Sequence, residues 1–515
     1  MKKKIVSVLL AAAMVATMAF GCGNSETASS GSAAAGDDSG EMTDIVVAQM
    51  CFSPLDASAT DAVEEAINKI TEEKINVHVD IQWFDATTYA TQIPMMIQAD
   101  EKLDVMMTTP VPGVAYSSFM AQGQLMDIAD LLDEYGQDAV DAVGKLDKAF
   151  ATKGGIYGLP TNRVLSNGEY VLMRKDVLDE LGLTEKAENL TTWSELEEIY
   201  KAVAENTDYA PVGNGDAEGS IVNVYPFNNG SDKFADNFGY DGLGDTNYMV
   251  SVDEETDTVE SVFASEDAAA AYERSNTWYN EDLVYKDAAS SQEYGDSLIK
   301  NGVAFSYIGM NDGEDFLTTK SAACGTELVA AKICDGVIGT TTATKFAYAV
   351  PITATEPEAA VKYLNLLYTD SDINNTLAWG VEGRDWEEVD GVATYPDGVT
   401  ADTVTYHTAD FLTANALITL PWDGAGSDAR EKEAASNEAA EISKYMGFCF
   451  DAANVEAEMT ACFNVKKQYD NGLKAGSSDY ATLYPEFIDK LEAAGMDKVI
   501  AEYQTQLDTW LAENK

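Results

Sequence analysis

The stretch TDIVVAQMCFSPLDASATDAVEEAINKITEEKINVHVDIQWFD, residues 43–85, decides the fold class. Its first part, residues 43–50, is an apolar run that predicts a buried strand. Residues 59–73 follow with apolar side chains at helical spacing, and residues 75–84 then alternate apolar and polar side chains as in a half-buried strand. A strand, a helix and a second strand in this order predict the start of a parallel α/β sheet.

The same pattern continues outward along the chain. Residues 85–100 are helix-like, and residues 102–110 predict a third strand. In open α/β sheets, ligands collect at the carboxyl ends of the strands. The residues at these ends that can stack on a ligand or hydrogen-bond to it are Phe52, Trp83, Phe84 and Thr109. We therefore expect these four side chains to face a ligand.

Helix starts are predicted further along by two capping boxes. Thr192 with Glu195 predicts a helix that begins near Trp193, which we expect to be a packing anchor. Thr355 with Glu358 has the same spacing and precedes an amphipathic segment. The C-terminus is predicted to be helical, because Val499, Tyr503, Leu507, Trp510 and Leu511 form one apolar stripe, with Gly495 breaking it from the helix before.

The N-terminus predicts export and lipid anchoring. Residues 1–21 have the basic start and short apolar core of a signal peptide. Gly21 and Cys22 follow, and this junction resembles a bacterial lipobox, in which the cysteine thiol receives a diacylglycerol. The rest of residues 22–42 is small, polar and low in complexity, which is typical of a flexible tether. An ordinary cleaved secretory peptide is the alternative.

Composition limits the partners and the chemistry. The chain has 88 acidic and 32 basic residues, so its surface repels phosphate backbones and nucleic acid is not an expected partner. Six cysteines are present, and five remain if Cys22 is lipidated. An odd number excludes a complete disulfide framework, and no spacing of Cys or His suggests a metal site. We expect buried free thiols and no cofactor.

Signatures of several enzyme classes are missing from the sequence. It contains only two histidines, His78 and His407, and neither stands in a nucleophile context. No P-loop, G-x-S-x-G or HExxH motif is present. Paired carboxylates such as Glu382 and Asp385 are a weak catalytic signal, because with so many acidic residues some pair always lies at glycosidase separation.

Aromatic residues in turn-rich segments suggest sugar binding instead. Sugar rings stack on aromatic planes, and their hydroxyls pair with polar side chains at the rim. This reasoning adds Tyr225, Trp379, Glu382 and Trp422 to the ligand candidates. Within TLAWGVEGRDWEEVDG (376–391), we expect Trp379 and Glu382 to face the ligand. The neighbouring Arg384, Asp385 and Trp386 are expected to pack and pair within the second lobe.

Several motifs resemble a known family. They are GGIYGLP (154–160), YVLMRKDVLDELGL with TTWSELEEI (170–199), NGVAFSYIGMND (301–312) and AYAVPITATEPEAAVKYLNLLYTD (347–370). Nearly all of residues 43–515 resembles the family 1 extracellular solute-binding proteins, the lipid-anchored ligand-binding components of bacterial ABC sugar importers. WGVEGRDWE, YPDGV and GFCFD (447–451) resemble a lipoprotein subgroup with a distinctive C-terminal region.

The resemblance implies an α/β, two-lobed, periplasmic-binding-protein-like (type II) fold with an interlobe cleft, a hinge and a helical C-terminal extension. The N-terminal lobe would take residues 43–160 plus 340–372, and the C-terminal lobe residues 161–339 plus 373–515. Asn162, Arg163, Tyr307 and Asn311 would face the cleft.

The implied function is capture of an oligosaccharide by hinge closure at the outer face of the cell membrane. The closed form would dock on ABC permease subunits as a monomer, and no bond would be broken. Two alternatives stay open. One is another solute, a peptide or an acidic sugar, that pairs with Arg163 or Arg384. The other is an extracellular glycan-active enzyme.

Overall fold

A computed structural model describes residues 42–514, apart from residues 53, 112, 153, 216–230, 235–240, 246, 248 and 311–315. The predicted signal peptide, Cys22 and the tether lie outside the described residues. No helix in the described part of the chain is both long and apolar enough to span a bilayer.

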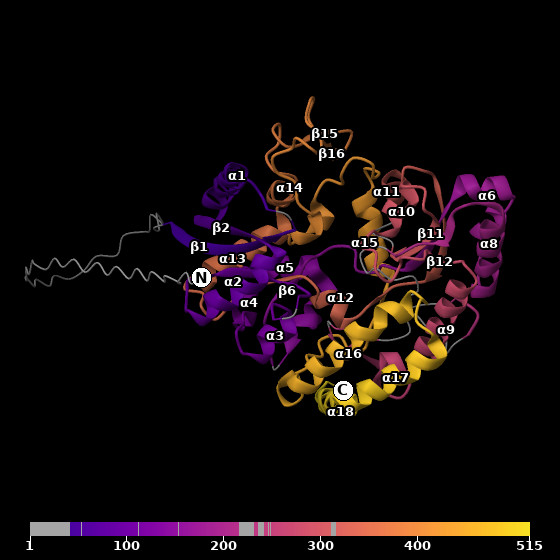
Figure 1. Cartoon of the computed structure of the whole chain (residues 1–515). Helices are drawn as coiled ribbons and strands as arrows, with labels where there is room; N and C mark the ends of the chain where they lie inside the picture. The colour runs from indigo at the N-terminus through magenta and orange to yellow at the C-terminus, as the bar shows by residue number, and fades with distance from the viewer. Residues whose placement is uncertain are drawn as a thin grey trace, which may run out of the picture. The chain divides into compact units, whose positions relative to one another are not determined.

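The first sheet confirms the strands predicted from residues 43–110. Its five strands lie in the order β2-β1-β3-β14-β6. Figure 1 labels β1, β2 and β6 of this sheet. Their bounds are β1 Thr43–Cys51, β2 Val77–Asp85, β3 Val105–Thr108, β6 Leu159–Pro160 and β14 Ala347–Ala349. Strands β1, β2 and β3 run parallel, whereas β14 runs antiparallel to β3 and β6. The main helices of this half are α1 Ala57–Ile75, α2 Ala86–Gln98, α13 Pro357–Thr369 and α14 Ser371–Trp379.

A second sheet forms the centre of the other half. Its strand order is β12-β7-β11-β8, with bounds β7 Glu169–Arg174, β8 Ala210–Val212, β11 Ala304–Met310 and β12 Leu328–Cys334. Helix α8 Trp193–Asn206 packs here, and its N-cap Thr192 accepts from the Glu195 amide, as predicted. Trp193 is buried in this core, which confirms its predicted role as an anchor.

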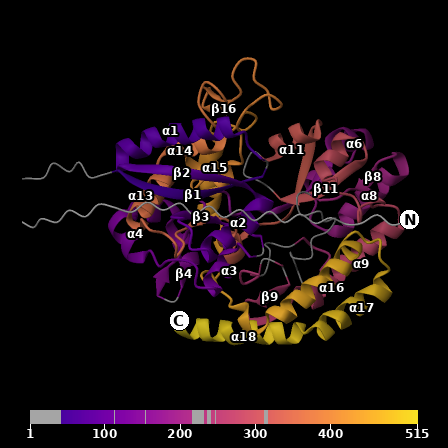
Figure 2. The same ribbon diagram turned by 60° about the vertical axis from the view of Figure 1, so that its left-hand side comes forward.

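The predicted C-terminal helices are present and belong to the second core. They are α16 Glu456–Lys474, α17 Tyr480–Ala494 and α18 Met496–Glu513. Val499, Tyr503 and Leu507 of α18 are buried, as the apolar stripe predicts. Figure 2 shows these helices (yellow) beside α9 Glu266–Asn280, and α18 also packs against β10 Thr258–Ser261.

The division of the chain between the two cores differs from the expected boundary at residue 373. Ile373, Leu377, Tyr406 and Leu412 pack in the first core, although the sequence analysis places everything after residue 372 in the second lobe. The reason is local, because α14 follows α13 after a single residue, Asp370, whose side chain caps it. Helix α14 therefore stays with the first sheet and packs against α1.

Three crossing segments join the two cores. They are residues 165–171, 333–338 and 442–445. One end residue of each segment is buried in the first core or packs against it, and the other end residue is buried in the second core. The last two are linked by short parallel strands, β13 Val337–Ile338 and β17 Glu441–Ile442. The first two crossing segments approach each other closely through their backbones. A Cβ atom on Gly336 would lie only 2.3 Å from the Asn167 carbonyl oxygen.

The five cysteines after Cys22 are free thiols, as expected. All of them are buried except Cys449, which is half-buried.

Candidate functional site

One edge of the first sheet collects six of the twelve predicted ligand residues. Because β1, β2, β3 and β6 all point the same way, their carboxyl ends meet at this edge. The register confirms it: Cys51 pairs with Asp85, and Ala347 pairs with both Thr108 and Pro160. The residues that follow these ends therefore lie at one edge, where parallel sheets bind ligands.

An aromatic chain runs along this edge. Phe52, whose side chain is 56% exposed, contacts Phe411 with 5.8 Å between ring centroids. Phe411 contacts Phe346 at 5.5 Å, and the Arg163 guanidinium lies 5.7 Å from the Phe346 ring centroid. Phe52 and Arg163, which were predicted on independent grounds, are thus linked through the two intervening rings of Phe411 and Phe346.

Trp83 and Phe84 end β2 at the same edge and are both half-buried. The Trp83 ring meets Tyr406 edge-on at 5.6 Å, and its Nε1 has no hydrogen-bond partner within the described residues. Phe84 packs edge-on against Tyr89 at 6.1 Å.

Asn162 and Arg163 lead from β6 into the first crossing segment. The Asn162 side chain donates to the Ala142 carbonyl, and its backbone amide donates to the Ala414 carbonyl. The Arg163 guanidinium donates to the carbonyls of Val164 and Thr342. Both residues therefore hold the chain that enters the first crossing segment to neighbouring backbone by hydrogen bonds.

Trp379 and Trp422 come together in a cluster that we call the ring cluster, consisting of Trp379, Tyr395, His407 and Trp422. Trp379 lies 4.9 Å from Trp422 and 5.0 Å from His407, and its Nε1 donates to the Leu420 carbonyl. Trp379 is only 4% exposed, so the outer surface of the cluster comes from the other three, half-buried rings. Tyr395 and His407 were not singled out by sequence reasoning, although an aromatic residue or histidine in a polar loop was a usable signal.

The expected packing roles of Arg384, Asp385 and Trp386 are confirmed. Asp385 is fully buried, pairs with Arg384 and accepts from the Val381 amide and the Thr405 hydroxyl. The Trp386 indole donates to the Gly380 carbonyl at 2.9 Å. Trp386 lies in a small core with Ala378 and Trp379, at the end of α14, and not in the second core, where the second-lobe expectation placed it. The neighbouring Glu382 is exposed.

The second sheet offers a different tyrosine from the predicted one. Tyr307 is 1% exposed and packs in a core cluster with Leu172 and Leu298, so it presents no ring face to a ligand in this structure. Tyr170 lies near the end of the first crossing segment. Its side chain is half-buried, and its ring centroid lies 4.7 Å from that of Phe316. Sequence reasoning missed Tyr170 because its strand pattern resembles that of a core position. The predicted Tyr225 and Asn311 lie outside the described residues.

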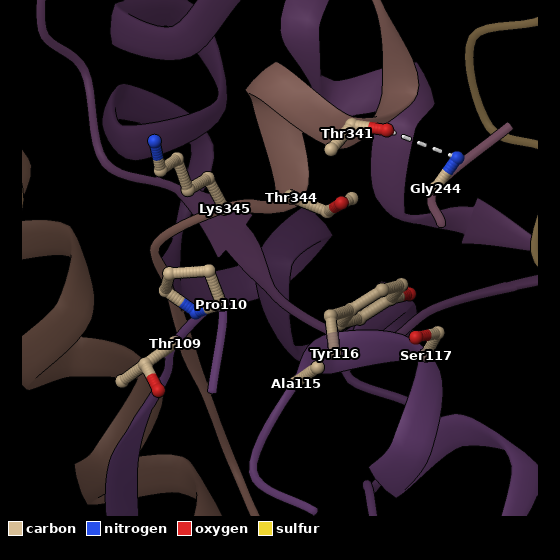
Figure 3. Close-up of a pocket in the computed structure, with 9 residues that line it drawn as sticks. All are labelled: Thr109, Pro110, Ala115, Tyr116, Ser117, Gly244, Thr341, Thr344 and Lys345. Carbon is tan, nitrogen blue, oxygen red and sulfur yellow. Dashed lines mark hydrogen bonds between the residues drawn. The ribbon is translucent and has the colours of Figure 1, made fainter. Parts of the chain in front are cut away.

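Thr109 lines a small pocket beside the crossing segments (Figure 3). Figure 3 shows Thr341 from the segment before β14 bonded to the Gly244 amide, with Pro110 and Tyr116 of the first half opposite. The space inside that admits a water-sized molecule is about 10 Å³, enough for about one water. A sugar ring does not fit there, so Thr109 sits beneath the sheet edge instead of forming a sugar pocket of its own.

Near this pocket, Asp241 joins the second half to the third crossing segment, at Ser443, and to Thr340, which lies two residues beyond the second one. Its buried carboxylate accepts from the amides of Leu243 and Thr340, and Ser443 also hydrogen-bonds to it. Burial raises the pKa of this carboxyl above its ordinary value. Asp245, four residues on, is equally buried with a raised pKa, but its bonds go to Asn247, Met249 and Val250 within its own loop.

No group of three or more His, Cys, Asp or Glu side chains suited to a metal ion occurs in the part of the chain that the structure describes.

Comparison with known proteins gives two family matches. Residues 56–373 match the model of a family described as bacterial extracellular solute-binding protein. Residues 444–512 match a domain of unknown function, DUF3502. The second match covers the C-terminal helices and GFCFD (447–451), one of the three motifs that resemble the subgroup with a distinctive C-terminal region.

Relatives agree with these matches. A carbohydrate ABC transporter substrate-binding protein of Streptococcus pneumoniae serotype 4 is 25% identical, over 98% of either chain. The crystal structure of the N-glycan transport solute binding protein of S. pneumoniae matches with a TM-score of 0.76 at 21% identity, covering 92% of this chain and 100% of that one. Its complex with Man5GlcNAc matches with a TM-score of 0.67 at 22% identity, over 92% and 99%. An HMO-binding solute binding protein of Bifidobacterium longum infantis matches with a TM-score of 0.62 at 16% identity, over 92% and 99%.

Proposed function

The chain belongs to the bacterial extracellular solute-binding proteins, and from this premise we propose that it captures an oligosaccharide outside the cell membrane and delivers it to the permease of an ABC importer. Capture proceeds by closure of two lobes, one built on each sheet, about the three crossing segments. The protein acts as a monomer and as a binding protein, not as an enzyme.

The observation that carries this proposal is the composition of the sheet edge. Phe52 and Trp83 supply ring surface, and the polar residues Asn162 and Arg163 follow the carboxyl end of β6 at the same edge. Rings with polar groups at the rim suit a sugar, because its C–H faces stack and its hydroxyls need donors and acceptors. Tyr170 and Phe316 would meet the sugar from the second lobe.

The relatives support the same class of ligand. The proteins of S. pneumoniae named above are described as carbohydrate-binding and N-glycan-transporting, and one of them is in complex with Man5GlcNAc. We take high-mannose N-glycan fragments as the first ligands to try.

An acidic solute is a weaker candidate. Of the two arginines that could clamp a carboxylate, Arg384 is already paired with the buried Asp385. Arg163 donates to backbone carbonyls. Nothing at the sheet edge favours a peptide.

Lipid anchoring at Cys22 completes the proposal and rests on the sequence. A Cys22→Ala variant is expected to appear in the culture medium, whereas the wild type stays with the membrane fraction and incorporates labelled palmitate. Wild-type protein free in the medium, with no lipid attached, would favour the ordinary secretory peptide.

The function is tested by a thermal-shift screen with Man5GlcNAc, Man1GlcNAc, maltohexaose, maltose, a galacturonate oligomer and a pentapeptide. An oligosaccharide at 100 times its Kd stabilises the folded protein by about 2.7 kcal/mol. The expected result is a higher Tm with an oligosaccharide and no release of reducing ends. A Tm raised only by the peptide, or new reducing ends, would overturn the proposal.

A further inference from the structure

We propose that the ring cluster of Trp379, Tyr395, His407 and Trp422 is a distal subsite that binds one end unit of a long oligosaccharide, with His407 and Tyr395 as contact residues. This inference rests on the proposed function and adds to it, because it makes the protein select for chain length.

The cluster has the surface that a sugar unit needs. Trp422 lies at its centre, 4.4 Å from His407, 4.8 Å from Tyr395 and 4.9 Å from Trp379. The rings of Tyr395, His407 and Trp422 are half-buried, so part of each faces outward. The buried Trp379 supports them from below, held by its bond to the Leu420 carbonyl. Fixed rings stack on a sugar at little cost in side-chain entropy.

The cluster also adjoins the sheet edge where the rest of the sugar is proposed to bind. Tyr406 is buried against Trp83 at the end of β2, with 5.6 Å between the ring centroids. His407 follows Tyr406 directly in the chain and turns its ring to the cluster. One bound oligosaccharide can therefore pass from Trp83 to the cluster without leaving the first lobe.

Two nitrogen atoms on either side of Tyr406 have unused hydrogen-bonding capacity. Within the described part of the chain, Trp83 Nε1 and His407 Nδ1 are buried without a partner. Buried polar atoms of this kind are rare and point to a missing water or ligand. The His407 ring is held between Trp379, Tyr395 and Trp422, so its position in the cluster is set by packing. A neutral imidazole both donates and accepts, as a sugar hydroxyl does.

The polar groups that build the surrounding segment are satisfied, in contrast to these two. Buried Asp385 is bonded to Val381, Arg384 and Thr405. Trp386 is bonded to the Gly380 carbonyl. Unpartnered buried polar atoms also occur elsewhere in the described part of the chain, such as Thr108 Oγ1 and Ser275 Oγ. What distinguishes the ring cluster is that its unpartnered nitrogen lies among rings that are partly exposed.

The test uses the fact that the chain has only two histidines. Protein labelled with ¹³C at histidine Cε1 gives two imidazole signals, and a His78→Gln variant assigns them. Each oligosaccharide that raises the Tm in the screen is titrated into the labelled protein, and its disaccharide counterpart is titrated into a separate sample. The pairs are Man5GlcNAc with Man1GlcNAc and maltohexaose with maltose. The expected result is a shift of the His407 signal by the long sugar only, while the His78 signal stays in place.

Affinity supplies the second measurement. His407→Phe or Tyr395→Phe should weaken binding of the long sugar about 3- to 10-fold, the worth of one hydrogen bond. Binding of the disaccharide should not change. A long sugar that raises the Tm but leaves both the His407 signal and these affinities unchanged would overturn the subsite and leave the proposed function standing. If no saccharide raises the Tm, the proposed function itself fails.

Discussion

Trp83 is the predicted ligand residue whose surroundings say most about its role. It lies near the end of β2 at the edge proposed to bind the ligand, rests edge-on against Tyr406, and has an indole N–H with no partner among the described residues. A purely structural tryptophan would use that group, as Trp278 does with Glu197.

Replacing Trp83 with alanine should weaken oligosaccharide binding. Loss of one stacking ring costs about 1–3 kcal/mol, or about 5- to 150-fold in Kd. Isothermal titration calorimetry with the sugar that raises the Tm most measures the change. Trp510→Ala is the matched control, because Trp510 packs against Phe448 in the second core. It should lower stability and leave Kd unchanged, and an unchanged Kd in the Trp83 variant would remove Trp83 from the site.

Asp241 and Asp245 form a natural pair for testing the hinge. Both carboxyls are buried with raised pKa values, but of the two only Asp241 bonds to a crossing segment, at Ser443, and also to Thr340 just beyond another. Asp241→Asn should weaken sugar binding severalfold, because a looser pivot adds freedom that closure must remove. Asp245→Asn should leave the affinity unchanged. Equal effects of the two variants on Kd would contradict the hinge role.

The two variants should share one effect on pH dependence. A raised folded-state pKa means that the folded protein holds the proton more tightly than the unfolded chain. The stability that each group contributes is therefore present below about 3.8, the ordinary Asp value, and is lost as the pH rises through the raised pKa. In either Asn variant, the free energy of unfolding should decrease less than in the wild type as the pH rises above 3.8. Urea unfolding at several pH values measures this difference.

Residue-level prediction from sequence succeeded where the partners are local. The Thr192 cap forms as its spacing predicts. The Thr355 box does not form, since α13 starts at Pro357 and the amides of Thr355 and Glu356 donate to Asp104. Asp104 lies about 250 residues away in sequence, so no local pattern could reveal it. Tyr307 was misplaced in the same way, because strand position alone does not tell which face is covered.

At the scale of elements, the crossing segments are the part that the sequence defined least well. Their strands, β13 and β17, are two residues each, too short for any periodicity to predict. The strands and helices of residues 43–110 were predictable because each has a full apolar pattern. The assignment of α14 to the first core depended on packing against α1, which sequence pattern does not contain.

The contact between the first two crossing segments gives the element-scale prediction. A Cβ on Gly336 would lie 2.3 Å from the Asn167 carbonyl oxygen, so Gly336→Ala must push the backbones apart. We expect a loss of about 1–3 kcal/mol in stability and a weaker sugar affinity. Chemical denaturation and calorimetry measure the two effects.

Gly472→Ala in α16 serves as the control for Gly336→Ala. Its Cβ would meet only the Ser478 hydroxyl, at 2.3 Å, and that side chain can turn away. Normal sugar affinity in Gly336→Ala would show that this contact does not take part in closure.

At the scale of the whole molecule, three crossing segments connect the two cores. A ligand that contacts both lobes can therefore change their relative orientation. Each lobe has its own sheet and its own buried residues. Closure therefore needs changes only in the crossing segments, while the two cores move as rigid bodies.

Closure predicts a smaller radius of gyration when sugar is bound. Small-angle X-ray scattering with and without saturating oligosaccharide measures it directly. The Asp241→Asn variant should show a smaller decrease at the same sugar concentration, because less of it is closed. An identical radius with and without a sugar that raises the Tm would contradict hinge closure.

The position of β14 between β3 and β6 has a consequence for the order of events during synthesis. Strand β6 pairs only with β14, and about 190 residues, including the whole second sheet, separate the two in sequence. At about 5–20 residues per second, that interval lasts roughly 10–40 s. During this time the first sheet lacks β14, and β3 is an edge strand with one side unpaired. We therefore expect the nascent chain to need a chaperone, or export in the unfolded state, until residue 349 has been synthesised.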